Sequence, residues 1–495
     1  MKRYICKEKI DVKRTRIKII SKEGRIRVGV EHIGIAHNET ELKMLLALSR
    51  ERLRDKHQEE FKFKEFEEEK ENKIIQKRTY SKYLYDTLSE VYNRIGIKEI
   101  EDEIFRKIII SRVIRPASKH ETIEILEDLG LESPTDIGIW RSLRRCEKLK
   151  YRQKISEEFI KISGINRASI LLYDVTTLYF EVEREDEYRK SGLSKERRLE
   201  PQIVIGLLVD EQGFPLGISS FEGNKAETKT MLPVLKEFRE RCKAEELTVV
   251  ADAAMMSGEN LDLLEAEGFK FIIGSRLAKT PYEIEEYRKV EKEELSDGQT
   301  FETAKVYKNK QNAKECLRRV VYQYRKKRAE LDLRNIDKQI RKAQKQIDSK
   351  AFTKKPKFLK LTQTSAELDE NLIKEVRLKA GVKGYVTNLN CAAQIIINGY
   401  HNLFNVEKSF RMTKSDLKAR PIFHRLRDSI EAHLTVCFAA LGICRYIQDR
   451  TKLSIKRFVR RLERLRTGII QIANKEHIAE PEIDAETQTL VNLLK

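Results

Sequence analysis

The order of strand-like and helix-like segments over residues 166–280 constrains the fold of this 495-residue chain more than any other feature. Three apolar runs rich in β-branched residues come first: SILLYDVTTLYFEVE, PQIVIGLLVD and GFPLGISSFEG. Helical and strand patterns then alternate through ETKTMLPVLKEFRERCKA, LTVVAD, SGENLDLLEAEG, with Ser257 as its N-cap, and FKFIIGS. We expect the first three strands to pair antiparallel and the later two to join them in parallel through helical crossovers.

This order is that of a ribonuclease H-like core, an α/β fold with a mixed sheet flanked by helices. We expect residues 166–280 to form its first part, and residues 281–380, which are very polar, to form an insertion domain. Residues 381–450 return to a strand pattern in GVKGYVTNLN and continue as two helices divided by Pro421, so they should hold the catalytic helix and the end of the core. Inside the insertion, apolar residues alternate at spacings of three and four: Leu333, Ile336, Ile340, Ala343 and Ile347. They predict a helix that packs on a partner helix, within the insertion or across a dimer.

The flanking regions are simpler. Residues 1–75 predict a short β-like segment followed by a highly charged helix, residues 76–165 a helical region, and residues 451–495 a basic helical tail. Within the helical region, HETIEILEDLGLES and PTDIGIWRSLRRCEKLK form two helices separated by a turn. Four cations share one face of the second helix: Arg141, Arg144, Arg145 and Lys148. This face either contacts DNA as a recognition helix does or is an ordinary basic surface.

Charge and composition narrow the class of partner. The chain has 99 Lys and Arg against 79 Asp and Glu, a net charge of +20, which favours a polyanion such as double-stranded DNA over a Lys-rich protein without such a partner. Seven cysteines without a CxxC pair argue against a zinc site or disulfide framework. The longest apolar run, Leu434–Cys444, is too short to cross a membrane and predicts a buried helix. The first residues lack a signal peptide's apolar region, so we expect a cytoplasmic, nucleoid-associated protein and no membrane partner.

Three carboxylates fall where the expected fold would gather them. Asp174 lies inside the first apolar strand, Asp252 ends the fourth strand, and Glu407 lies on the helix after the insertion. Such a cluster suits hard cations, and Mg²⁺, or Mn²⁺ in its place, prefers oxygen ligands. Two ions ~3.5–4 Å apart promote in-line phosphoryl transfer. Taken singly, either aspartate is equally well a turn or helix-cap residue.

Three segments around these acids, YDVTTLYFE, VVADAAMMSGENL and YHNLFNVEKSFRMTK, resemble the DDE transposases of bacterial insertion sequences. The resemblance is to insertion sequence family four, the group with a Tyr, Arg, Glu, Lys signature. Tyr400, Glu407 and Lys414 match the spacing of that signature, and Leu403 stands at its Arg position, as in the branch that continues LKARPIFH. Arg411, one turn beyond Glu407, is the candidate to supply the missing charge. FEGNKAET also resembles a block of this family.

The resemblance implies a transposase that cleaves DNA at element ends and transfers the strands into target DNA by cut and paste, through phosphodiester hydrolysis and transesterification. It implies that Asp174, Asp252 and Glu407 bind two Mg²⁺ ions, and that the protein forms a homodimer on inverted-repeat ends. We expect Tyr400, Arg411 and Lys414 to contact DNA, with the helical region recognising the ends. In several relatives an aromatic residue of the insertion stacks on a flipped base, a role that would fall here to Tyr322, Tyr324 or another aromatic residue. The alternatives are a ribonuclease H-like endonuclease without strand transfer and a noncatalytic DNA-binding protein on the same fold.

Overall fold

The structure, a computed structural model, describes most of the chain and divides it into two compact units. The described residues are 2–11, 14–54, 74–165, 168–182, 184–193, 199–244, 246–255, 257–275, 277, 280–290, 294–308, 315–349, 356–361, 366–472 and 475–495. One unit comprises residues 1–75 with 471–476, and the other comprises residues 76–470 with 477–495. The candidate site lies in the second unit.

The first unit is a small antiparallel sheet covered by one helix. Its elements are β1 (Lys2–Lys9), β2 (Thr15–Glu23), β3 (Ile26–Ala36) and α1 (Glu39–Arg54), with the strands in the order β1-β2-β3. Ile17 and Ile19 alternate with polar neighbours along β2 and are fully buried, because one face of the sheet packs against α1. The expected short β-like segment is therefore a complete sheet, and residues 55–73 of the expected charged helix lie outside the described residues.

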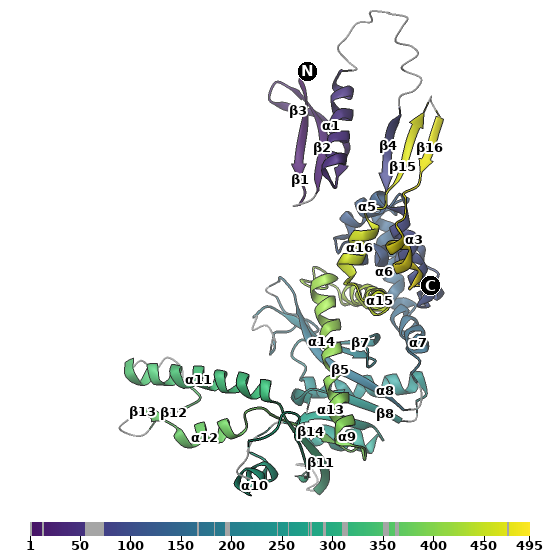
Figure 1. Cartoon of the computed structure of the whole chain (residues 1–495). Coiled ribbons are helices and arrows are strands. Elements are labelled where there is room, and N and C mark those ends of the chain that lie inside the picture. Colours follow the sequence, from purple (N-terminus) through teal and green to yellow (C-terminus); the bar gives the residue numbers. More distant parts are fainter. Residues whose placement is uncertain are drawn as a thin grey trace, which may run out of the picture. The chain divides into compact units, whose positions relative to one another are not determined.

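The second unit begins with a helical region (Figure 1). Its helices are α3 (Lys82–Arg94), α4 (Glu103–Ile114), α5 (Lys119–Asp128), α6 (Asp136–Lys148) and α7 (Tyr151–Ser163). Local capping explains several boundaries: Ser118 forms a capping box with Glu121 at the start of α5, and Thr135 caps α6. The turn predicted between the two sequence segments is the turn between α5 and α6.

A mixed sheet forms the centre of this unit, in the order β10-β11-β14-β9-β8-β5-β6-β7. Its strands are β5 (Ala168–Tyr179), β6 (Gln202–Val209), β7 (Pro215–Glu222), β8 (Glu246–Ala251), β9 (Lys270–Ser275), β10 (Thr300–Lys308), β11 (Glu315–Tyr324) and β14 (Val382–Thr387). The first three pair antiparallel, and β8 and β9 join β5 in parallel, as predicted. The mixed α/β class with a sheet flanked by helices is thereby confirmed.

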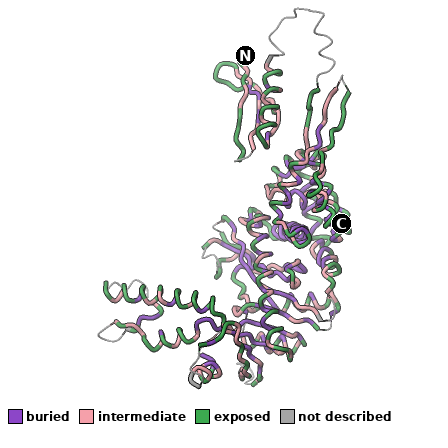
Figure 2. The backbone as a smooth tube through the Cα atoms, in the orientation of Figure 1, coloured by how far each residue is buried: buried purple, intermediate pink, exposed green. Residues whose placement is uncertain are grey.

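Each face of this sheet packs against a separate hydrophobic core. Along β6, Ile203 and Ile205 belong to the core shared with the helical region, whereas Val204 and Leu208 belong to the opposite core. The opposite core is covered by α8 (Met231–Cys242) and α9 (Gly258–Ala266), and Ser257 caps α9 as predicted. Figure 2 shows the resulting burial of the strands. Because successive side chains point to opposite faces, only every second residue of a strand faces a given core.

The insertion differs in part from the expected separate domain. Its strands β10 and β11 extend the central sheet, because β11 pairs with β14 and β10 pairs with β11, and α10 (Tyr282–Val290) packs beside β10. The predicted helix is α11 (Lys326–Ser349), and its partner, α12 (Glu370–Leu378), lies within the insertion. Ile336, Ala343 and Ile373 form their small core with Phe358, next to the short strands β12 (Leu359–Leu361) and β13 (Ala366–Leu368).

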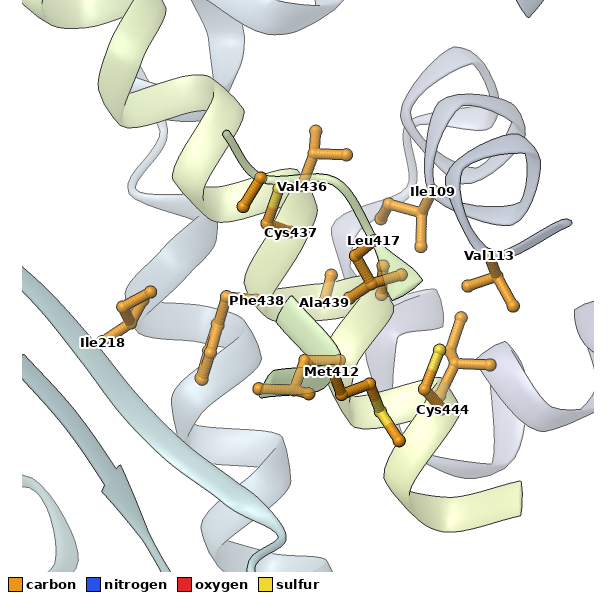
Figure 3. Packing of buried hydrophobic residues seen from close by; sticks show 14 of the residues in the cluster. Ile109, Val113, Ile218, Met412, Leu417, Val436, Cys437, Phe438, Ala439 and Cys444 are labelled. Atoms are coloured by element: carbon orange, nitrogen blue, oxygen red, sulfur yellow. The ribbon is translucent and has the colours of Figure 1, made fainter. Parts of the chain in front are cut away.

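After the insertion the chain packs back across the sheet. The helices are α13 (Ala393–His401), α14 (Phe404–Arg411) and α15 (Arg427–Thr451), and Pro421 lies between the last two. By length and composition α15 is apolar enough to cross a membrane, but 94% of its apolar window is buried inside the structure, so it is a core helix. Figure 3 shows its side chains between Ile109 and Val113 of α4 and Ile218 of β7. The buried helix predicted around Leu434–Cys444 is confirmed.

The end of the chain differs from the expected helical tail. It contains α16 (Ile455–Leu462), β15 (Thr467–Ile472), β16 (Lys475–Ala479) and α17 (Ala485–Asn492). The strands form a small sheet with β4 (Ile75–Tyr80), in the order β16-β15-β4. The segment TGIIQI is rich in β-branched residues, a strand signal that the surrounding basic residues obscured.

Candidate active site

Asp174 and Asp252 lie on neighbouring strands at the same level of the sheet. The parallel pairing of β5 with β8 runs up to Leu172 opposite Val250. The same register, carried two residues further, sets Asp174 beside Asp252, which directly follows β8. Because neighbouring strands are about 4.8 Å apart, the two carboxylates leave the sheet close to each other.

Alternation along the strands places both aspartates on the face covered by α13, α14 and α15. Leu172 and Val250, two residues earlier on each strand, belong to the core under these helices. Side chains two apart on a strand share a face, so Asp174 and Asp252 point the same way. Asp174 is half-buried and Asp252 is exposed, so the pair lies at the solvent edge of the core.

Glu407 reaches the same face on α14, which packs against β5 and β6. Its neighbour Val406 is buried in the core, while Glu407 itself is exposed. Burial raises the pKa of Tyr400, and the negative charges of Asp252 and Glu407 raise it further. The charges of both carboxylates thus act on the same phenol, and a shared site for the three acids stays a prediction.

The segment predicted to form the catalytic helix is interrupted. α13 ends at His401, α14 begins at Phe404, and Met412–Asp416 form a π-helical turn. Leu403, at the N-cap of α14, is only 6% exposed and packs in the core. An unpaired guanidinium would be costly at such a position, which gives a physical reason for leucine where the signature has arginine.

Tyr400 contacts a catalytic candidate directly. Its ring is buried, and its hydroxyl donates a hydrogen bond to Oδ1 of Asp252 at 3.0 Å. Gly274 on β9 makes room for this contact, because a Cβ atom there would lie 2.7 Å from the Tyr400 hydroxyl. The observed partner of Tyr400 is thus a carboxylate, and the contact with DNA stays a prediction.

Lys383 is a site residue that the sequence analysis missed. It lies on β14, and its Nζ atom is 4.2 Å from the centre of the Tyr400 ring, within cation–π range. Burial lowers its pKa and Arg328 lowers it further, while the charges of Asp252 and Glu407 act in the opposite direction. The only sequence signal was a charged residue inside an apolar strand, and this one was hidden among 99 cations.

The FEGNKAET block adjoins the site. The 3₁₀ turn Glu227–Lys229 contacts the turn Ala253–Met255 that follows β8. Burial raises the pKa of Tyr173, and the charges of Asp174 and Glu227 raise it further. In the sequence this block resembles a segment of the transposase family, and no role was predicted for it.

The donor set at this edge suits a divalent ion. Asp174, Asp252 and Glu407 offer hard carboxylate oxygens, and only one oxygen of Asp252 is engaged by Tyr400. Among the described residues, one group of three possible ligands has donor atoms within 4.8 Å of one another: Asp262, Glu265 and Cys316. Arg318 already pairs with both carboxylates of that group, so it reads as an ion-pair cluster. The three candidate catalytic acids do not form so tight a group.

The predicted DNA contacts on α14 and beyond differ in accessibility. Arg411 is exposed at the end of α14, one turn from Glu407, and Lys414 is half-buried in the π-helical turn. Tyr322, a candidate to stack on a flipped base, is fully buried on β11, and Tyr324 is half-buried. Tyr322 is thus unsuited to that role, because stacking on a base needs an open ring face.

The four predicted cations on α6 are all exposed: Arg141, Arg144, Arg145 and Lys148. Arg145 is the one with a structural partner, because it donates from Nε at 3.0 Å and from Nη2 at 2.7 Å to the buried Asp102, the N-cap of α4. Arg145 therefore has a structural contact that the spacing could not reveal. The face also carries the half-exposed Trp140, with Lys119 Nζ 3.1 Å from its ring centre.

The strand register and the packing of α14 thus put three acids on one face of a mixed sheet, with a phenol hydroxyl bonded to one of them. The family model described as "Transposase DDE domain" matches residues 166–443, more than half of the chain. The chain therefore belongs to the DDE-domain transposases. The matched range covers the mixed sheet, the insertion and α14, and so includes all three acids.

Other comparisons add little. No curated protein matches the sequence. A solved structure, the piggyBac transposase synaptic complex with hairpin DNA, is 13% identical and covers 77% of this chain and 70% of its own, with a TM-score of 0.36. A score this low does not establish a common fold.

Proposed function

We propose that this protein is a cut-and-paste DNA transposase with a ribonuclease H-like core, of the Tyr, Arg, Glu, Lys signature group of insertion sequence family four. One observation carries the proposal: the β5–β8 register brings Asp174 beside Asp252 on the face where Glu407 lies. The family model supports transposase activity, and the Tyr400, Glu407 and Lys414 spacing supports the narrower group.

In this proposal Asp174, Asp252 and Glu407 hold two Mg²⁺ ions, or Mn²⁺ in their place. Bound divalent ions would activate the attacking water or 3′ hydroxyl and stabilise the leaving oxygen. Tyr400 holds the Asp252 carboxylate in one orientation through its hydroxyl, and the packing of α14 on β5 holds Glu407 at the same edge. Fixed ligands lose little freedom when substrate arrives, which favours the transition state.

The proposed substrate is double-stranded DNA, bound as a homodimer at inverted-repeat ends in the cytoplasm, near the nucleoid. Arg141, Arg144 and Lys148 offer exposed cations on α6 for the phosphate backbone. Arg411 and Lys414 lie beyond Glu407, where they suit the phosphates beside the scissile bond. The net charge of +20 supports a polyanionic substrate.

The test measures cleavage and strand transfer on labelled end-bearing DNA with Mg²⁺ or Mn²⁺, in Asp174→Asn and Glu407→Gln variants. We expect both variants to lose activity by at least three orders of magnitude while still binding DNA, because removing a metal ligand removes most of the charge stabilisation. Glu240→Gln, an exposed acid on α8, is the matched control and should be unchanged.

Two outcomes would contradict the proposal. Full strand transfer by either acid variant would exclude these residues from catalysis. Cleavage by the unaltered protein without any product joined to labelled target DNA would indicate a nuclease that does not transfer strands.

A further inference from the structure

Lys383 lies on β14 beside the Tyr400 ring, and the proposed catalytic function gives it no role. It pairs with Gln323 across β11 and β14, immediately after the insertion. Tyr385, two residues later on the same strand, belongs to the core under α13, so Lys383 points to the same face of the sheet as the three acids. Lys383 is therefore a strand cation on the face of the sheet that carries the carboxylates.

An aromatic platform holds the ammonium group of Lys383. Its Nζ atom is 4.2 Å from the ring centre of Tyr400 and 6.0 Å from that of Tyr385. The two rings pack on each other with centres 4.8 Å apart. A cation held against ring faces has its position fixed without a carboxylate partner in contact, so its charge acts on the acids through space.

The other end of the platform is the Tyr400 hydroxyl, which donates to Asp252 at 3.0 Å. A cation on the face of a phenol draws electron density from its oxygen, which makes the hydroxyl a stronger donor. Lys383 therefore acts on Asp252 in two ways that have the same sign: through its own charge and through the Tyr400 hydrogen bond. Both interactions attract the carboxylate.

We propose that Lys383 is a positioning residue that balances the charge of Asp252 and Glu407 when no metal ion is bound, so that a divalent ion must bind against its positive charge. The inference rests on the proposed metal-dependent function. It implies coupling: a DNA phosphate that approaches Lys383 would offset that charge, so DNA should tighten metal binding, and metal should tighten DNA binding by the same factor.

The experiment measures Mn²⁺ binding to the full chain by the paramagnetic resonance signal of free Mn²⁺, with and without end-bearing DNA. For Lys383→Met without DNA we expect Mn²⁺ to bind about three-fold to ten-fold more tightly, with a smaller further gain from DNA, because one nearby unit charge is removed. Lys383→Arg should behave like the unaltered protein. A purely structural loss would weaken binding instead, so the sign of the change separates the two roles.

Lys305→Met is the matched control. Lys305 also lies on a strand of the central sheet with its Nζ atom over a tyrosine ring, 5.2 Å from the centre of Tyr322, but the acid acting on it is Glu283. Its Mn²⁺ affinity should not change. Lys383→Gln repeats the test with a polar side chain if the methionine variant folds poorly.

Unchanged or weaker Mn²⁺ binding in both neutral variants of Lys383 would overturn the inference while leaving the proposed function intact. Mn²⁺ binding that survives Asp252→Asn without loss would overturn the proposed metal site, and the inference with it.

Discussion

Tyr400 shows how much one buried hydroxyl contributes to the site. Burial raises its pKa, and the neighbouring charge of Asp252 and their hydrogen bond raise it further, so the phenol keeps its proton across the physiological range. It can therefore only donate to Asp252, and the carboxylate keeps one fixed hydrogen bond. The sequence identified Tyr400 but assigned it to DNA, because a signature gives spacing and not the contact made.

Removing only that hydroxyl tests its contribution. We expect Tyr400→Phe to lower the single-turnover cleavage rate roughly 10-fold to 100-fold, because a hydrogen bond to a charged group contributes about 1.5–3 kcal/mol. The ring remains under Lys383, so the melting temperature should change little. Rapid-quench cleavage of end-bearing DNA measures the rate.

Tyr385→Phe is the control for this change, because its ring packs against Tyr400 at 4.8 Å while the hydrogen bond to Asp252 comes from Tyr400. It should cleave at close to the normal rate. Equal losses in the two variants would mean that general packing, and not the Asp252 contact, accounts for the effect.

At the scale of elements, the sequence predicted the strands that carry the acids better than those of the insertion. β5, β6 and β8 are long apolar runs buried on both faces, so their order could be read directly. β10 and β11 join the same sheet, yet β10 is an edge strand with alternating charges, and such a pattern resembles a polar loop. The side to which an edge strand pairs is a tertiary choice that local pattern does not contain.

The candidate site was predictable to a similar degree. Asp174 and Asp252 were predicted from their joint placement within a recognisable order of strands, and their catalytic role stays a prediction. Lys383 and Gly274 were not, because their roles depend on contacts with Tyr400, which is distant in the sequence.

Asp102 ties three helices of the helical region together. It caps α4 by accepting from the backbone N–H of Phe105, and it also accepts from Ser142 and Arg145 on α6 and from the hydroxyl of Tyr151 at the start of α7. Burial alone would raise its pKa, but these hydrogen bonds and the Arg145 charge outweigh burial and hold the pKa below its usual value. The ionised form is therefore the one the fold selects.

We expect Asp102→Asn to lower the free energy of unfolding by about 1–3 kcal/mol at neutral pH, because the amide presents a donor to a ring of donors. Since the folded pKa is depressed, the contribution of Asp102 is present above the unfolded pKa of about 4 and is lost as the pH falls through the folded value. Urea unfolding at pH 7 and below pH 4 measures the loss of unfolding free energy in the variant at neutral pH and how much of that loss remains in acid.

The comparison for Asp102 is Asp136→Asn, an exposed acid in the first turn of α6, which should cost only a few tenths of a kcal/mol. A difference between the two variants that does not shrink in acid would contradict the charge-based account.

At the scale of the whole second unit, α15 joins the helical region to the sheet within one core. It contacts α3, α4, α6 and α7 on one side and β7 on the other. Gly442 lets it approach closely, because a Cβ atom there would overlap the ring of Phe159, which is fully buried between Phe214 and Phe438. The joint is therefore close-packed.

Gly442→Ala sets two effects against each other. Alanine favours a helix by about 1 kcal/mol over glycine, whereas overpacking a core costs about 1–3 kcal/mol. We expect overpacking to win, with a net loss of up to about 2 kcal/mol in thermal unfolding, because the Phe159 ring is held by two others.

Adding Phe159→Leu should recover part of that loss, while Gly217→Ala, whose nearest new neighbour is a flexible arginine 3.9 Å away, should be nearly neutral. Stabilisation by Gly442→Ala alone would contradict the expected overpacking, because it would show that the core around Gly442 has room for a methyl group.

Because α15 packs the helical region and the sheet into one continuous core, the distance between α6 and the carboxylates beside β5 is fixed. If α6 binds a duplex, the carboxylates therefore lie at a fixed distance from the bound base pairs. Lengthening an element end by one base pair should then move the cleavage site by one nucleotide relative to the terminus, about 3.4 Å along the strand. A change in the spread of cleavage positions without such a shift is not expected.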